Sequence, residues 1–337
     1  MPRQGSPEGR RIRRSGEHGN ARWYGPSPMK VLVTGGAGFI GSHVVERLVA
    51  DDHEVVVLDD LNTGFRENIH PSARLVVGSV ADEALVRDTV DGCEVVFHEA
   101  AHKAVLRSVE HPLPTDTANT HGTLTVLKAA LDAGVRRVVH ASSSSIYGGA
   151  AQVPTREDEP ALPRSPYAVS KLAAEHYCRV FHELYGLETV ALRYFNVYGP
   201  RQRPDATYAA VIPLFVDALL NGRRPVVHGD GLQSRDFTYI SDVVDANMVA
   251  ATAPADCCGG RVYNIAAGAS WSLLDILRIL GDLLGVVPEP EFTAPRPGDV
   301  RRSQADGGAA ARDLAFKCRV SMEEGLRLTV EWLRALA

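Results

Sequence analysis

The residues best suited to chemistry are Tyr167 and Lys171, four positions apart in the stretch 165–171. In a helix they would lie on one face, one turn apart. An ammonium beside a phenol favours the phenolate, so this spacing predicts a pKa of Tyr167 that falls toward neutrality. Such a phenolate can take a proton from an alcohol near pH 7. Ser165 and Pro166 are typical of a helix N-cap and first turn. The alternative for so common a motif is an ordinary surface helix.

A glycine-rich turn near the start of the folded sequence suits a dinucleotide. The apolar run Lys30–Thr34 leads into Gly-Gly-Ala-Gly-Phe-Ile-Gly at 35–41, and a helical pattern continues to about Ala50. Gly35 and Gly38 would let the backbone approach a pyrophosphate, and Gly41 would let helix and strand pack closely. The first amides of the helix would bind the phosphates. This Gly-x-x-Gly-x-x-Gly spacing differs from the dehydrogenase version.

Two acids end the second predicted strand, Glu54–Leu58. Asp59 and Asp60 follow the glycine turn at about the distance expected for an acid that binds ribose. A carboxylate there can accept both hydroxyls of the adenosine ribose and repels a 2′-phosphate. Leu-Asn-Thr-Gly comes next, without an Arg, so the sequence favours NAD over NADP. A merely capped strand end would not explain the coincidence with the glycine turn.

Strand-like and helix-like segments alternate through the first half of the chain. Further strands are predicted at 75–78, 94–98 and 137–141, and helical patterns near 81–90 and 114–133. Such alternation predicts the α/β class, with a parallel, doubly wound sheet. Ligands then bind at the carboxyl ends of the strands. Two polar stretches, 100–103 and 142–145, follow two of these ends.

The bulk composition is that of an ordinary globular protein. Apolar residues make up 45% of the chain and charged residues 23%, and the formal net charge is −5. The mild negative charge disfavours nucleic acid and anionic membranes as partners. No apolar run is long enough to span a bilayer. The five cysteines show no metal-ligand spacing, which favours free thiols in a reducing cytoplasm and no metal site.

Together these features resemble the extended short-chain dehydrogenase/reductases, specifically nucleotide-sugar 4-epimerases of the UDP-glucose, UDP-N-acetylglucosamine and UDP-glucuronate type. The matching stretches are 35–41, 59–60, 98–103, 119–123, 142–148, 165–171, 192–202, 229–237 and 295–299. The resemblance covers everything after residue 28. It implies a Rossmann-like, doubly wound parallel sheet of six or seven strands, a smaller C-terminal substrate lobe, and a homodimer formed through two helices that flank the sheet.

The resemblance also implies the catalytic roles. Tyr167 would be the base, and Lys171 its electrostatic partner and a ligand of the nicotinamide ribose. Ser143 would bridge Tyr167 and the sugar 4-oxygen. Loss of the 4-hydroxyl proton and of a hydride from C4 gives a 4-keto sugar, and return of the hydride to the other face gives the epimer. NAD is regenerated in each turnover, so no second substrate is needed.

Binding residues follow from the same resemblance. Those implied for NAD are Gly35, Gly38, Phe39, Ile40, Gly41, Asp59, Asp60, Ala100, Ala101, Lys103, Asn119, Ser142, Tyr167, Lys171 and Tyr194. Those implied for the UDP-sugar are Ser143, Asn196, Ala210, Val211, Gln233, Arg235, Arg296, Asp299 and Ser303. The arginines suit the pyrophosphate. Ser79 departs from the family pattern, which has Asp near the adenine, and implies a weaker grip there.

The residues after Ser143 decide the reaction class. Sugar 4,6-dehydratases of this fold have Asp-Glu there, and nucleotide-sugar decarboxylases keep a Glu at the second position. Here Ser144 and Ser145 stand instead. Neither hydroxyl can serve as an elimination base near pH 7, so the sequence favours epimerisation over dehydration. A non-catalytic NAD-binding protein is a further alternative, but such proteins typically lose the Tyr or the Lys.

Substrate choice depends on Ser303. In the family, this position lies near the sugar C2 substituent, and a bulky residue blocks N-acetyl groups. A serine leaves room, so we expect epimerisation of UDP-N-acetylglucosamine and UDP-N-acetylgalactosamine, with UDP-glucose and UDP-galactose as further substrates. UDP-glucuronate is the alternative, because Arg301 and Arg302 could attract its carboxylate.

Residues 1–28 differ from the rest of the chain. They contain six Arg and two Glu among Gly, Ser and Pro. The paired arginines resemble a basic targeting patch, but no apolar core follows, as a signal peptide would need. We expect a disordered extension with Met29 as the true start, and a nucleic-acid or membrane tether is the alternative. The NAD-binding domain should span 29–195, with returns near 237–265, and the substrate lobe mainly 196–337.

Overall fold

The computed structural model describes residues 28–149, 152–205, 209–295 and 300–336. The expected N-terminal extension, apart from residue 28, lies outside the described residues. Among the described helices, none combines the length and the apolar character that a bilayer crossing needs.

A seven-stranded parallel sheet forms the centre of the molecule, which confirms the predicted fold class. Its order is β11–β6–β5–β4–β1–β2–β3. The strands are β1 (Lys30–Thr34), β2 (Glu54–Asp59), β3 (Arg74–Val77), β4 (Val95–His98), β5 (Arg137–Ser143), β6 (Glu188–Tyr194) and β11 (Arg261–Ile265). The strand order reverses between β1 and β4, and this is the switch point at which open α/β sheets bind ligands.

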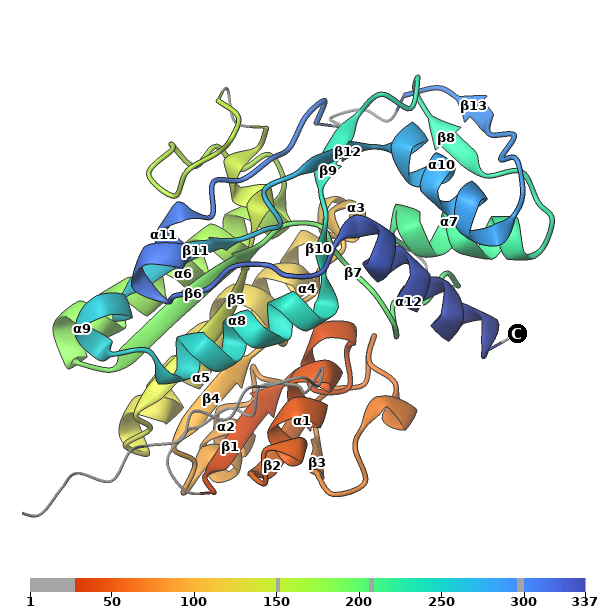
Figure 1. Ribbon diagram of the computed structural model, residues 1–337. Helices are drawn as coiled ribbons and strands as arrows, with labels where there is room; N and C mark the ends of the chain where they lie inside the picture. The colour runs from red at the N-terminus through yellow and green to blue at the C-terminus, as the bar shows by residue number, and fades with distance from the viewer. Residues whose placement is uncertain (1–27, 150–151, 206–208, 296–299, 337) are drawn as a thin grey trace, which may run out of the picture.

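Helices cover both faces of this sheet, because its central strands are apolar on both sides. Alternate strand residues such as Val33 and Phe97 face the core that includes α1 (Phe39–Ala50) and α8 (Ile240–Thr252). The neighbouring Leu32 and Val96 face the opposite core. The helices on that second face are α2 (Glu83–Val90), α5 (Gly122–Asp132) and α6 (Pro166–Tyr185). The ribbon diagram shows the two helical layers (Figure 1).

The helix predicted near 114–133 is wound in three parts. These are α4 (Pro112–Asp116), the π-helical turn η2 (Thr117–His121) and α5, and they follow the short α3 (Val105–Glu110). A π turn inside a helix adds a residue to the turn and often marks a functional site. Here it carries Asn119, whose amide oxygen accepts a bond from the His102 backbone amide at 2.8 Å. The turn therefore holds the segment that follows β4.

A smaller lobe lies beyond the carboxyl end of the sheet (Figure 1, upper right). It contains α7 (Val211–Leu220), α10 (Leu273–Leu284), α12 (Met322–Arg334) and the strand pairs β8 (Val226–His228) with β13 (Glu291–Thr293) and β9 (Ser234–Asp236) with β12 (Ser270–Ser272). A capping box between Ser272 and Asp275 starts α10. The remaining elements are η1 (Arg66–Asn68), η3 (Ser144–Tyr147), β7 (Val197–Tyr198), β10 (Thr238–Tyr239), α9 (Ala255–Cys258) and α11 (Gly308–Asp313).

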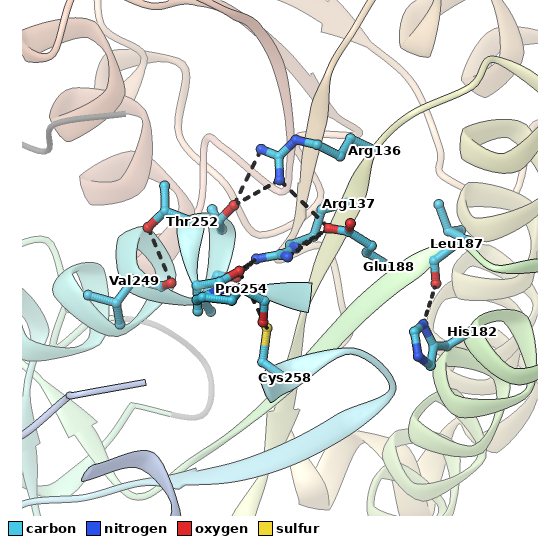
Figure 2. A network of polar contacts seen from close by, with 12 residues as sticks. Arg136, Arg137, His182, Leu187, Glu188, Val249, Thr252, Pro254 and Cys258 are labelled. Carbon is cyan, nitrogen blue, oxygen red and sulfur yellow. Dashed lines mark hydrogen bonds and ion pairs between the residues drawn. The ribbon is translucent and has the colours of Figure 1, made fainter. Parts of the chain in front are cut away.

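At the amino end of β5, Arg137 ties this strand to β6 and α8. Its side chain is buried, forms an ion pair with Glu188 at 2.7 Å, and donates to the carbonyls of Ala250 and Ala253 at 2.8 and 2.7 Å. The neighbouring Arg136 lies 3.7 Å from the Glu188 carboxylate and donates to the Ala251 carbonyl at 3.4 Å (Figure 2). These carbonyls end α8, where a cation also complements the helix dipole. The contact anchors the amino ends of β5 and β6, away from the cavity described next.

Candidate active site

One cavity of about 700 Å³ runs along the carboxyl ends of the central strands. It is large enough for a bound cofactor or substrate. Its lining extends from the turn after β1 and the acids after β2, past the ends of β4, β5 and β6, to the loop at 300–303 in the lobe. The tertiary structure therefore brings the chemically promising stretches of the sequence to one place.

Helix α6 presents Tyr167 and Lys171 to this cavity on one face, as their spacing predicts. The Ser165 hydroxyl caps the helix by accepting from the Ala168 amide at 3.1 Å, and Pro166 occupies the first turn. Tyr167 is 8% exposed and Lys171 3%. These side chains lie at the end of β5 and line the cavity together with Ser143, whose hydroxyl lowers the pKa of the Tyr167 phenol. The three residues therefore form one constellation.

The predicted low pKa of Tyr167 is wrong for this state of the molecule. Burial raises the pKa of the phenol above its ordinary value, the Ser143 bond lowers it, and the Glu99 carboxylate raises it. The Lys171 ammonium donates to the Ala141 carbonyl at 2.7 Å. Helical spacing alone reveals neither the burial of the phenol nor the bond between Lys171 and the Ala141 carbonyl.

The glycine turn has the shape that a dinucleotide requires. Gly35 has φ +71°, and a Cβ there would lie 2.6 Å from the Ala100 backbone nitrogen. A Cβ on Gly41 would lie 2.3 Å from the Gly35 carbonyl oxygen. Larger residues would therefore push α1 away from β1 and fill the approach to its first amides. Because Gly38 is the N-cap of α1 and lines the cavity, those amides can meet a pyrophosphate, and the residues present fit NAD.

Asp59 is held at the end of β2 with both carboxylate oxygens engaged. Its Oδ2 accepts from the Ala37 amide at 2.9 Å and its Oδ1 from the Leu61 amide at 2.8 Å. Burial raises its pKa, whereas these two amides lower it. Asp59 and Asp60 both line the cavity, and a carboxylate oxygen has a further lone pair for a ribose hydroxyl. Ser79 lines the same end of the cavity.

Most of the residues implied by the resemblance line the cavity. They are Gly35, Gly38, Phe39, Ile40, Gly41, Asp59, Asp60, Ala100, Ala101, Lys103, Ser142, Ser143, Tyr167, Lys171, Tyr194, Asn196, Arg235 and Ser303. Asn119, Ala210, Val211 and Gln233 lie outside its lining. Arg296 and Asp299 lie outside the described residues.

The residues outside the lining have other contacts. Asn119 is buried and clamps the backbone of His102. Gln233 is buried too, and its amide donates to the His228 carbonyl at 2.6 Å. Ala210 and Val211 form the N-terminal end of α7. Of the four, Asn119 supports the cavity indirectly, because His102 belongs to the lining.

Ser142 reaches the cavity but directs its hydroxyl elsewhere. The hydroxyl donates to Glu175 Oε1 at 2.5 Å, and Glu175 forms a buried ion pair with Arg193 at 2.8 Å. Arg193 also donates to the Tyr147 hydroxyl at 2.7 Å. This network joins α6, β6 and η3 beneath Ser143, and thereby holds its loop. Local spacing in the sequence does not indicate this network, since its members come from three separate segments.

Glu99 is a second residue that the sequence analysis did not single out. It follows the last residue of β4, lines the cavity, and accepts a bond from the Tyr194 hydroxyl at 2.8 Å. The available signal was a charged residue directly after an apolar strand. Residues 100–103 were selected because they follow the carboxyl end of that strand, and residue 99 follows it as well. Burial raises the pKa of Glu99 to about 7.

Away from Asp59 and Asp60, the lining contains small and cationic residues. Ser144 and Ser145 follow β5, Ser303 lies in the loop at 300–303, and the cations are the arginines at 164, 235 and 302. Arg301 instead forms a bidentate pair with Asp230, at 2.7 and 2.9 Å, on the exposed surface. The cavity thus has an acidic end suited to a ribose and a basic end suited to a diphosphate.

Comparisons with known proteins agree with this geometry. Residues 31–266 match the NAD dependent epimerase/dehydratase family. A UDP-glucose 4-epimerase from Mycolicibacterium smegmatis is 42% identical over 91% of this chain and 99% of its own. The structure of the Thermotoga maritima UDP-glucose 4-epimerase with UDP-glucose has a TM-score of 0.88, 38% identity and coverage of 91% and 99%. A Methanobrevibacter ruminantium UDP-N-acetylglucosamine 4-epimerase with UDP-N-acetylmuramic acid also has a TM-score of 0.88, 38% identity and coverage of 92% and 99%. An Actinoplanes dTDP-glucose 4,6-dehydratase is similar as well.

Proposed function

Because this chain belongs to the NAD-dependent epimerase/dehydratase family, we propose that it epimerises C4 of a UDP-sugar through a transient 4-keto intermediate. The observation that carries the proposal is the meeting of Ser143, Tyr167 and Lys171 in the cavity that also contains the glycine turn. A base, a bridging hydroxyl and a dinucleotide cradle are together what oxidation of a secondary alcohol needs.

In this mechanism the chain's residues move the proton and hold the reactants. Tyr167 takes the proton of the sugar 4-hydroxyl, with Ser143 bonded to the same oxygen. Lys171 stabilises the phenolate by its charge. Bound NAD would accept the C4 hydride and return it. Once the keto sugar has presented its other face, Tyr167 gives the proton back, so electrons and protons balance without a second substrate.

The residues after Ser143 favour epimerisation over dehydration. Ser144 and Ser145 line the cavity and carry no carboxylate. Among the described lining residues, the carboxylates are Asp59 and Asp60 at the ribose end and Glu99 against Tyr194. None of these follows Ser143, where elimination at C5 and C6 would need an acid–base pair.

The proposed substrate is UDP-N-acetylglucosamine, with its 4-epimer as product and UDP-glucose as a second substrate. Ser303 supports this choice, because it lines the cavity with a small side chain. One NMR experiment tests it: purified protein is incubated separately with UDP-N-acetylglucosamine, UDP-glucose and UDP-glucuronate. Formation of UDP-N-acetylgalactosamine is expected. Accumulation of a 4-keto-6-deoxy sugar would instead identify a dehydratase.

UDP-glucuronate 4-epimerisation remains the second candidate. The observation in its favour is Arg302, which lines the cavity next to Ser303 and could pair with the sugar carboxylate. Arg301 supplies no such support, because Asp230 already holds it. Consumption of UDP-glucuronate alone in the same NMR experiment would establish this alternative.

We also propose a homodimer in the cytoplasm. Exposed apolar side chains lie on α3, α4 and α6, among them Val109, Leu113 and Val169, and α3 and α4 both pack against α6. Such a patch is typical of a protein interface. The five cysteines are free thiols, as a reducing compartment favours. Light scattering of the wild type and Leu113→Glu would test the dimer. We further propose an NAD-binding domain at 29–195, with returns near 237–265, and a substrate lobe formed mainly by 196–337; α8 and β11 lie in those returns.

A further inference from the structure

Glu99 occupies a special place among the carboxylates of the cavity. It follows the end of β4, and its Oε1 accepts a hydrogen bond at 2.8 Å from the hydroxyl of Tyr194, the last residue of β6. Asn247 on α8 in turn donates to the Tyr194 oxygen at 2.8 Å. Because β5 lies between β4 and β6, this chain of hydrogen bonds crosses the end of β5, where Lys171 is bonded to the Ala141 carbonyl.

Three elements place titratable groups around Lys171. These groups are Tyr167, Glu175 and Cys178 on α6, His98 and Glu99 at the end of β4, and His140 on β5. Burial lowers the pKa of both imidazoles, so they stay neutral, and burial raises the pKa of the Cys178 thiol to about 12. Arg193 balances the charge of Glu175 in a buried ion pair. Glu99 is therefore the carboxylate left to act on Lys171.

We propose that Glu99 is a positioning residue for the reaction: held by Tyr194, its carboxylate keeps the buried Lys171 ammonium charged, and so preserves the cation that stabilises the Tyr167 phenolate. The inference rests on the proposed roles of Tyr167 and Lys171. It adds a residue that acts through Lys171 rather than on the sugar.

Burial explains why Lys171 needs such a neighbour. It lowers the pKa of Lys171 to about 8, and Glu99 is the strongest influence that raises it again. Burial raises the pKa of the Glu99 carboxyl, whereas Tyr194 and Lys171 lower it, so the charged forms of Glu99 and Lys171 favour each other. Glu99 also raises the pKa of Tyr167, so the carboxylate that keeps Lys171 charged also makes the phenol harder to ionise.

The pKa of Lys171 can be measured directly, because the chain has only five lysines. Protein with bound NAD is labelled with ¹³Cε-lysine, the Lys171 signal is assigned by its loss in Lys171→Ala, and its chemical shift is followed with pH. Glu99→Gln removes the charge but keeps an acceptor for Tyr194. The pKa of Lys171 is expected to fall by about one pH unit, the low end of the effect of a nearby opposite charge.

Two further variants make the result specific. Glu99→Asp keeps the charge and should hold the pKa of Lys171 close to that of the wild type. Glu183→Gln makes the same chemical change on the exposed end of α6, and should leave the pKa unchanged. An unchanged pKa of Lys171 in folded Glu99→Gln would overturn the inference.

The rate profile separates this inference from the proposed function. With whichever UDP-sugar is turned over, the alkaline limb of kcat against pH should move downward in Glu99→Gln by the same shift as the lysine titration. A fall in the pKa of Lys171 without that movement would overturn the role in the reaction. If the wild type turns over none of the three sugars, the epimerase proposal fails, while the lysine titration still decides whether Glu99 controls Lys171.

Discussion

Lys171 donates its ammonium to the carbonyl oxygen of Ala141 at 2.7 Å. The contact joins the fifth residue of β5 to the second turn of α6. It places the cation beside Ser142 and Ser143 rather than free in the cavity. Because a carbonyl oxygen supports the charged form of an amine, the contact also helps a buried lysine to stay protonated.

Replacement of Tyr167 by phenylalanine should abolish most of the turnover. The fold and the bound NAD should remain, whereas epimerisation falls at least about a hundredfold, the typical size of a general-base effect. The measurement is the rate of 4-epimer formation by NMR, together with the NAD content of the purified variant. Tyr185→Phe makes the same change on the exposed end of α6 and should retain wild-type turnover. Near wild-type turnover in Tyr167→Phe would remove this residue from the mechanism.

Loss of the lysine cation should move the pH optimum upward. In Lys171→Ala the phenol keeps the burial that raises its pKa but loses the charge that favours its ionised form, so a higher pH is needed to form the base. The acid limb of the kcat profile reports this shift. Lys128→Ala, which removes an exposed lysine paired with Asp132, serves as the control and should leave the profile in place. An acid limb at the wild-type position in Lys171→Ala would contradict the role of the cation.

Asp59 should determine the choice between NAD and NADP. Its negative charge at the ribose end disfavours a 2′-phosphate. Asp59→Ala should lower the ratio of bound NAD to bound NADP. Asp59→Asn should do so with less disturbance of the size and shape of the side chain, although its single amide oxygen can accept from only one of the Ala37 and Leu61 amides. Chromatography of the dinucleotide released from each purified protein measures the preference. NADP released from the wild type would overturn the assignment.

A large side chain at position 303 should discriminate between sugars. Ser303→Tyr is expected to fill the space beside C2 and to lower kcat/KM for UDP-N-acetylglucosamine far more than for UDP-glucose. Ser303→Ala keeps the space open and should preserve the ratio of the two values. Equal losses for both sugars in Ser303→Tyr would show that this residue does not lie against the C2 substituent.

Arg137 should contribute to the stability of the fold and not to catalysis. Arg137→Met leaves Glu188 and two carbonyls of α8 without their buried donor, and should lower the free energy of unfolding by about 3 kcal/mol, the low end for breaking a buried ion pair. Arg136→Met removes a partly exposed arginine and should cost less than about 1 kcal/mol. Urea unfolding measures both. A similar small loss in each variant would show that the contact in Figure 2 is not an anchor.

The sequence by itself determined the features that depend on local geometry. The turn at 35–41, the alternation of strands with helices, and the capped start of α6 follow from the backbone freedom of glycine, the spacing of apolar residues and the chemistry of Ser165 and Pro166. The shared face of Tyr167 and Lys171 could be predicted for the same reason, because it depends on neighbours within a few positions. The parallel sheet could be predicted because strands that alternate with helices are joined by crossover connections.

Only the tertiary structure decided where side chains point and which charges they meet. The pKa of Tyr167 depends on burial and on Glu99, which lies in a distant segment of the chain. Asn119 turns to His102 because the packing of η2 beside the segment after β4 makes that backbone amide its partner. Spacing along the chain constrains a residue's place on its own element. Desolvation and electrostatic forces act through space, so they are set only when the elements pack together.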